Sequence, residues 1–145
     1  MTVKEIRVIS ICVFRHDDSI LVFHGFDSVK GTPFYRPLGG AVEFGETTRE
    51  AIEREIREEL GLEADDLKLL GTLENIFLYE GEPGHEIVFV YDGRFKDDSV
   101  YRMESLTVCE DNGVTMKATW RNLDSFDDYH RLVPEELMSL LRDNG

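Results

Sequence analysis

Residues 40–62 read GAVEFGETTREAIEREIREELGL, and this stretch decides how the whole chain is interpreted. Residues 46–60 contain neither Gly nor Pro and consist mostly of good helix formers. Thr47 or Thr48 can cap the beginning of such a helix, and Gly61 stands where helices commonly end. The stretch therefore predicts a helix over residues 46–60.

One face of this predicted helix is acidic. At about 100° per residue, Glu55, Glu58 and Glu59 fall within a single sector of the helix. Such like charges repel each other unless solvent screens them or a cation lies between them. Carboxylate oxygens are hard ligands that suit Mg²⁺ or Mn²⁺. The pattern favours a metal site, and the alternative is a solvated helix face with ion pairs.

The surroundings of the acidic face indicate a rigid site. Ile52, Ile56 and Leu60 fill the adjoining sector and predict that the helix packs on a core. Upstream, Gly39 and Gly40 allow backbone conformations or close approaches that side chains would block. We expect a constrained turn there.

Size and charge limit the classes of function. The chain has 145 residues and a mass of 16.7 kDa, which fits one domain spanning residues 1–145. Its formal net charge of −14 argues against a broad contact with nucleic acid or an anionic membrane. An anionic small molecule can still bind where a divalent metal reverses the local field.

Cysteine usage and hydropathy exclude further classes. Cys12 and Cys109 lack C-x-x-C spacing and predict neither a disulfide framework nor a zinc site. The segment from residue 1 to residue 7 lacks a signal-type hydrophobic region, and no stretch approaches the length of a membrane span. We therefore expect a cytoplasmic protein with no membrane partner.

The remaining chain reads as strands with a terminal helix, which together suggest a mixed α/β sandwich. The predicted elements are a hairpin of Val8–Phe14 with Ile20–Phe23, a second hairpin of Leu67–Tyr79 with Glu86–Phe95, a strand at Val114–Trp120, and a helix from Pro134 through Leu141.

The sequence closely resembles one enzyme family at defined positions of residues 40–62. These positions are Gly40, Glu46, Arg54, Glu55, Ile56, Glu58, Glu59, Gly61 and Leu62. They match the Nudix box G-x5-E-x7-R-E-U-x-E-E-x-G-U, in which U is a bulky aliphatic residue. The chain thus resembles the MutT-like Nudix hydrolase family. The resemblance implies an α/β/α sandwich with a mixed β-sheet.

The resemblance implies roles for individual residues. Glu55, Glu58 and Glu59 would bind two or three Mg²⁺ or Mn²⁺ ions, with the carbonyl of Gly39 or Gly40 as a further ligand. Glu46 and Arg54 would support the catalytic site. Relatives differ in the carboxylate that deprotonates the attacking water, and the candidates here are Glu55, Glu86 and Glu110, in that order. Glu110 is also a candidate metal ligand.

The implied reaction is hydrolysis of a phosphoanhydride by attack of water on phosphorus. The expected substrate is a nucleoside triphosphate, a dinucleoside polyphosphate or another nucleoside diphosphate derivative. Arg36 is the candidate for phosphate, Tyr79 for a base and Glu86 for a further substrate contact. Tyr79 stands 17 residues beyond Leu62, similar to a tyrosine of enzymes acting on dinucleoside polyphosphates.

Two other functions stay open at this point. A Nudix-fold sensor would bind nucleotide without hydrolysing it, although the complete box disfavours this. An RNA 5′-end pyrophosphohydrolase is disfavoured by the acidic chain, as is nucleic acid binding in general. A homodimer is also consistent with the resemblance, because many relatives form dimers.

Overall fold

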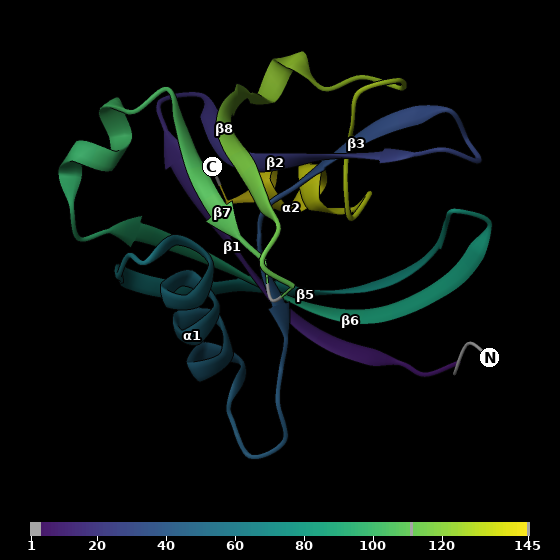
Figure 1. Ribbon diagram of the computed structural model, residues 1–145, viewed down its shortest axis with the longest axis horizontal. Helices are drawn as coiled ribbons and strands as arrows, with labels where there is room; N and C mark the ends of the chain where they lie inside the picture. The colour runs from purple at the N-terminus through teal and green to yellow at the C-terminus, as the bar shows by residue number, and fades with distance from the viewer. Residues whose placement is uncertain (1–3, 111, 145) are drawn as a thin grey trace.

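The computed structural model describes residues 4–110 and 112–144, and within them nine strands and two α-helices follow one another (Figure 1). The strands are β1 Arg7–His16, β2 Ser19–Asp27, β3 Thr32–Arg36, β4 Leu38–Ala41, β5 Ala64–Tyr79, β6 Glu82–Phe95, β7 Ser105–Cys109, β8 Thr115–Asn122 and β9 Arg131–Leu132. The helices are α1 Thr48–Leu60 and α2 Leu137–Asp143, with short 3-10 helices at Asp98–Arg102 and Leu123–Ser125.

The strands form a mixed sheet with two halves. One half has the order β5-β6-β1-β4, and the other has the order β7-β8-β2-β3-β9. β1 runs parallel to β6 and β3 runs parallel to β9, whereas the other pairs are antiparallel. The predicted first hairpin is confirmed at its turn, but β1 and β2 pair only at Arg15–Ile20 and His16–Ser19 before they diverge into different halves.

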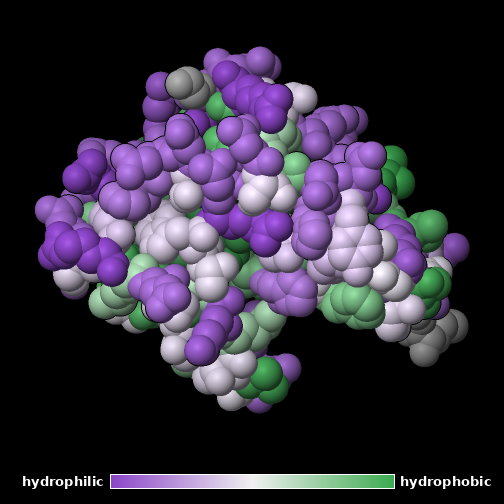
Figure 2. Space-filling view, turned by 90° about the horizontal axis from the view of Figure 1, so that it is seen from above, coloured by the Kyte–Doolittle hydropathy of each residue, from purple (hydrophilic) through white to green (hydrophobic). Residues whose placement is uncertain are grey.

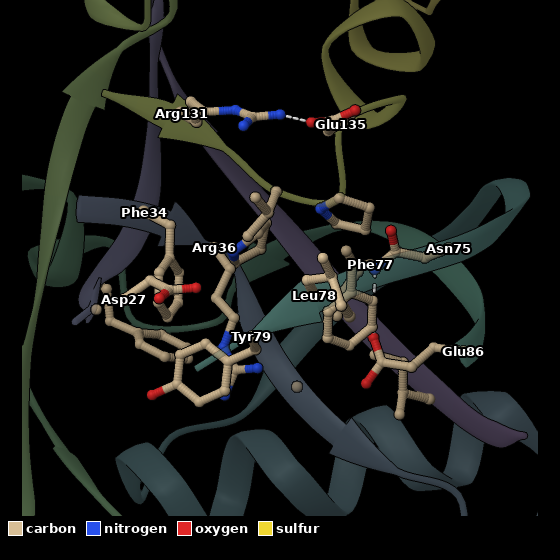
Figure 3. A pocket seen from close by; sticks show the side chains of 18 of the residues that line it. Asp27, Phe34, Arg36, Asn75, Phe77, Leu78, Tyr79, Glu86, Arg131 and Glu135 are labelled. Carbon is tan, nitrogen blue, oxygen red and sulfur yellow. Dashed lines mark hydrogen bonds and ion pairs between the residues drawn. The ribbon is translucent and has the colours of Figure 1, made fainter. Parts of the chain in front are cut away.

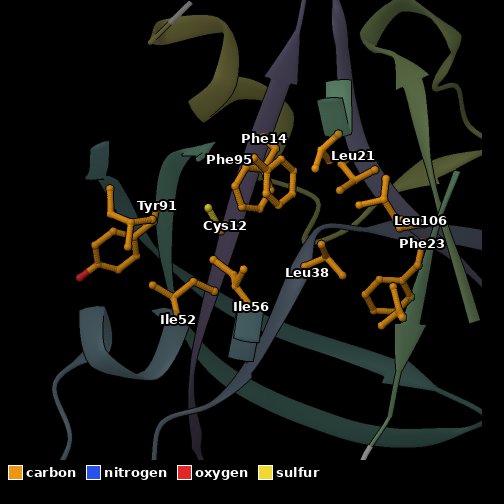
Figure 4. Close-up of a cluster of buried hydrophobic side chains, with 14 residues drawn as sticks. Cys12, Phe14, Leu21, Phe23, Leu38, Ile52, Ile56, Tyr91, Phe95 and Leu106 are labelled. Atoms are coloured by element: carbon orange, nitrogen blue, oxygen red, sulfur yellow. The ribbon is translucent and has the colours of Figure 1, made fainter. Parts of the chain in front are cut away.

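Strand β1 contributes to two hydrophobic cores because successive side chains point to opposite faces. On one face, Cys12 and Phe14 are fully buried in a core that includes Ile52 and Ile56 of α1, as Figure 4 shows. On the opposite face, Val13 belongs to a second core that includes Leu137 and Leu141 of α2. The two helices therefore pack on different cores of the mixed sheet, as expected for an α/β sandwich.

Local signals fix both ends of α1. Thr47 is the N-cap: its side chain accepts from the Glu50 backbone N–H at 3.1 Å, and the Glu50 carboxylate accepts from the Thr47 N–H at 2.9 Å. Gly61 ends the helix with a left-handed φ of 67°, which suits glycine. The predicted helix is confirmed, but Glu46 precedes the extended cap and lies outside it.

Two local predictions are wrong. Gly39 and Gly40 do not form a turn but belong to β4, which pairs with β1. A Cβ on Gly39 would lie 2.0 Å from the Ser10 carbonyl oxygen, so glycine is required by the close strand contact. The last helix begins at Leu137 rather than at Pro134, because the Val133 N–H donates to the Tyr35 carbonyl and keeps the chain extended up to the proline.

The second hairpin is confirmed and is longer than predicted. Its tight turn lies at Glu80 and Gly81, which both have positive φ, while Pro83 and Gly84 fall inside β6. Both cysteines are free thiols: Cys12 is buried and Cys109 is exposed. Within residues 4–110 and 112–144, no helix has the length and apolar character needed to cross a membrane.

Candidate functional site

Arg54 organises the acidic end of α1. Its Nη2 donates to Glu46 Oε1 at 2.7 Å and its Nε donates to Glu46 Oε2 at 3.1 Å, which makes a bidentate pair. Its Nη1 donates to Glu55 Oε1 at 2.9 Å and to Glu58 Oε2 at 3.3 Å. A further bond of 3.0 Å from Nη2 to the Ala41 carbonyl ties the helix to β4. We call this set of contacts the Arg54 clamp.

The Arg54 clamp stabilises the ionised form of Glu46. The Arg54 guanidinium, followed by a backbone bond from Glu43, lowers the pKa of Glu46 to about 2. The pKa of Arg54 is raised in turn, chiefly by its hydrogen bonds to Glu46. Glu46 precedes the N-cap Thr47, so its carboxylate binds Arg54 from outside the helix.

Glu55 lies directly against β4. A Cβ built on Gly40 would lie 2.7 Å from the Glu55 Cδ and 2.7 Å from its Oε1. Any side chain at position 40 would therefore displace this carboxylate. The glycine pair of β4 thus serves two close contacts: Gly39 approaches the backbone of β1, and Gly40 admits the carboxylate of Glu55.

Glu59 differs from its neighbours because it is buried with one carboxylate oxygen left without a partner. The residue is 7% exposed, and its Oε1 has no hydrogen-bond partner among the described residues. Burial, followed by the charges of Glu55 and Glu110, raises the pKa of Glu59 to about 8, and the charge of Arg36 opposes this shift. These interactions bring Glu110 and Arg36 into the surroundings of the acidic helix face.

A cavity of about 890 Å³ begins at the same place. Gly39, Gly40 and Glu110 line it at the acidic end of α1, and Arg36 lies within it. Figure 3 shows Phe34 on one side of Arg36, with Asn75 and Glu86 on the other side. The acidic helix face and the cavity therefore meet at the two glycines of β4.

Family membership follows from comparison with known proteins. A family model for the NUDIX domain matches residues 4–141. The chain belongs to the Nudix family. An uncharacterized Nudix hydrolase of Listeria innocua is 33% identical over 81 residues, which cover 54% of this chain and 46% of that protein. The match thus spans less than half of the length of this Nudix relative.

Solved Nudix structures share the fold. The MutT NUDIX hydrolase of Burkholderia pseudomallei has a TM-score of 0.68 at 23% identity, covering 95% of this chain and 98% of that one. A NUDIX hydrolase of Nitrosomonas europaea has a TM-score of 0.63 at 19% identity, covering 97% and 88% of the two chains. The expected Nudix sandwich is confirmed. Nudix hydrolases generally use divalent metal ions.

The Nudix box residues lie together, but they do not surround one point. Within residues 4–110 and 112–144, no three His, Cys, Asp or Glu side chains are arranged to hold a metal ion. The Glu58 carboxylate instead accepts a bond from Arg54 Nη1 at 3.3 Å. The Glu58 side chain is 49% exposed, so this 3.3 Å contact is the weakest of the clamp.

The structure brings the predicted substrate contacts into the cavity. Arg36, Tyr79 and Glu86 all line it. The Arg36 guanidinium lies 4.7 Å from the centre of the Phe23 ring, and the Tyr79 ring meets Phe34 edge-on at 5.6 Å.

Sequence reasoning missed several polar residues of the cavity, among them Arg7 and Asn75. Both flank Glu86 in the sheet, at Arg7–Glu86 and Asn75–Glu86. The alternation of side chains along a strand could have shown which face of its own strand each residue occupies. The register that brings them beside Glu86 is not visible in any local pattern.

Proposed function

We propose that this Nudix chain is a divalent-metal-dependent pyrophosphohydrolase that cleaves a phosphoanhydride bond in a nucleotide-like small molecule. A nucleoside triphosphate or a dinucleoside polyphosphate is the leading substrate class, and residues 1–145 are proposed to form one domain. The main support is the position of the acidic end of α1, where Glu55 lies against Gly40 at the rim of the cavity.

The residues present fit a hard divalent cation such as Mg²⁺ or Mn²⁺. Glu59 is a buried carboxylate with one unpartnered oxygen. A cation would offset both the burial of its charge and the repulsion from Glu55 and Glu110, which together raise its pKa. We propose that Glu55, Glu58 and Glu59 hold the metal, with the carbonyl of Gly39 or Gly40 and the carboxylate of Glu110 as further ligands. When bound, the metal would neutralise phosphate oxygens and acidify a water molecule.

The protein groups around this site have separate proposed tasks. Arg54 and Glu46 orient Glu55, and their two charge-assisted bonds fix the guanidinium fork. Glu55 is the proposed base that removes a proton from the attacking water. Arg36, whose charge already acts on Glu59 from inside the cavity, is the proposed phosphate contact.

Release of phosphate and pyrophosphate from a substrate panel tests this function. The panel contains nucleoside triphosphates, dinucleoside polyphosphates and a 5′-triphosphate RNA, each with Mg²⁺, Mn²⁺ or chelator. We expect turnover only with metal, and a loss of at least about 100-fold in Glu58→Gln and Glu59→Gln. Glu53→Gln is the matched control, because Glu53 lies on the same helix and pairs with Arg49 instead.

Each alternative gives a different result in this panel. Near-parental turnover of both Gln variants at saturating Mg²⁺ would reject the assignment of the acidic face. Nucleotide binding with no product in any metal would support a sensor. Preference for the RNA would support an RNA 5′-end enzyme, although the net charge of −14 disfavours this outcome. Figure 2 shows that one face of the molecule is largely hydrophilic, which does not distinguish these alternatives. A cytoplasmic location and a homodimer stay predictions.

A further inference from the structure

Three polar side chains stand side by side on one face of the sheet. Arg7 of β1 pairs in register with Glu86 of β6, and Glu86 pairs in register with Asn75 of β5. Directly paired residues point to the same face, so the three side chains form a line across three strands. All three line the cavity. We call them the polar row.

The polar row is bordered by apolar residues on both sides. Toward the core, the next position on the same face of each strand is buried and apolar: Ile9, Val88 and Leu73. Away from the core, the Phe77 ring lies over Gly84, where a Cβ would come within 2.3 Å of the Phe77 Cζ. Figure 3 shows Phe77 beside Asn75 and Glu86. Of these apolar neighbours, Ile9 and Phe77 line the cavity on the two sides of the polar row.

The carboxylate of Glu86 is poorly satisfied by its neighbours. Asn75 Nδ2 donates to its Oε1 at 3.5 Å, and Arg7 Nη1 lies 3.8 Å from its Oε2. Both distances exceed the 2.7–3.2 Å that is typical of strong hydrogen bonds. Its side chain is only 12% exposed, and a buried carboxylate is unfavourable unless it is well hydrogen-bonded. Glu86 therefore keeps acceptor capacity for a ligand in the cavity.

We propose that the polar row recognises the edge of a guanine-type base in the nucleotide substrate; this inference rests on the proposed function. Guanine presents two adjacent N–H donors, on the ring and on the exocyclic amine, next to a carbonyl acceptor. The two oxygens of Glu86 match the two donors, and the guanidinium of Arg7 matches the carbonyl. Adenine would place the lone pair of a ring nitrogen against the carboxylate, and two acceptors repel each other.

The position of the row suits a base whose phosphates reach the acidic end of α1. Arg7 and Ile11 point to the same face of β1 and lie about 13 Å apart at the usual rise per residue. Ile11 pairs with Gly39, which lines the cavity together with Gly40. Glu55 lies against Gly40 on the opposite face, the side on which α1 packs. Arg36 lines the same cavity. A base at the polar row would therefore direct its phosphates along β1 to the two glycines, where the cavity meets the acidic face of α1.

Titration calorimetry with GMP, IMP and AMP tests the inference without any turnover, because none of the three contains a phosphoanhydride. We expect GMP to bind at least about tenfold more tightly than AMP, with IMP between them because it lacks the exocyclic amine. Glu86→Gln should remove most of the GMP preference and leave AMP binding within about twofold. Glu74→Gln is the matched control, since Glu74 is exposed on the neighbouring strand and precedes Asn75.

Several outcomes would overturn the inference. Equal binding of GMP and AMP by the parent, or no binding of any of the three, contradicts base recognition. An equal loss of GMP and AMP binding in Glu86→Gln, with an unchanged melting temperature, would assign Glu86 to a general role such as metal binding. Discrimination of GMP from AMP by a protein that hydrolyses no nucleotide would support the polar row and reject the pyrophosphohydrolase.

Discussion

The acidic end of α1 and the polar row both hold carboxylates, but they satisfy them differently. Glu46 and Glu55 receive bonds of 2.7–3.1 Å from Arg54, whereas Glu86 has contacts only of 3.5 and 3.8 Å. Glu59 is the exception within the acidic end, because one of its oxygens has no partner among the described residues. Arg54 therefore fixes the orientation of Glu46 and Glu55, whereas Glu59 and Glu86 keep oxygens that the protein does not fully satisfy.

The largest expected effect comes from breaking the Arg54 clamp. Arg54→Lys keeps the charge but removes the planar fork that binds Glu46 and Glu55 together. We expect kcat/KM to fall at least about 100-fold and the melting temperature to fall as well. Arg57→Lys, in the last turn of the same helix, should leave both quantities close to the parent. Parental kcat/KM in Arg54→Lys would show that Glu55 needs no orientation by the fork.

A smaller effect is expected at the aromatic side of the cavity. If the Tyr79 ring holds a second base, Tyr79→Ala should weaken a dinucleoside polyphosphate by about 1–3 kcal/mol and a mononucleotide by much less. KM values for the two substrates measure the difference. Tyr129→Ala is a control, because Tyr129 is also exposed but lies outside the cavity lining. Equal losses for both substrates would point to damage of the packing with Phe34 instead.

The smallest effect concerns the stability of the metal-free protein. The pKa of Glu59 is raised to about 8, mainly by burial, compared with about 4.3 in an unfolded chain. The favourable contribution of its neutral form is therefore complete below about pH 4.3 and is lost as pH rises toward 8. In chelator, Glu59→Gln should gain melting temperature over the parent progressively between pH 5 and pH 8.

The control for this titration is Glu53→Gln, whose difference from the parent should not change over the same pH range. A constant difference for Glu59→Gln would contradict a raised pKa at this position. A large loss of melting temperature at every pH would instead indicate that Glu59 makes a stabilising ion pair.

The helix and its box were predictable because their signals are local. The cap at Thr47, the stop at Gly61 and the sector of Glu55, Glu58 and Glu59 depend only on spacing along one helix. The beginning of the helix was predicted two residues early, because Glu46 resembles a first-turn acid although it serves the Arg54 clamp from outside. This stretch carried most of the family resemblance, and the family model that matches residues 4–141 agrees with it.

The cavity was not predictable in the same way because it depends on pairing between distant strands. Glu86 was recognised as a candidate, but its neighbours Arg7 and Asn75 meet it only through the register of β1, β6 and β5. Close backbone approach was correctly given as a reason for Gly39 and Gly40, but a turn was predicted where the structure has strand β4. A strand contact and a tight turn make the same demand on glycine, so composition alone does not distinguish them.

The two thiols differ in accessibility, which leaves Cys109 as a single site for attaching a spectroscopic probe. Cys12 is fully buried, and burial raises the pKa of its thiol well above the usual range, so it is a poor nucleophile toward labelling reagents. Cys109 is exposed at the end of β7 and directly precedes Glu110, which lines the cavity. A fluorophore or spin label added to the folded protein would therefore attach at one position, beside the proposed site. Ligand and metal titrations could then be followed optically without introducing any cysteine.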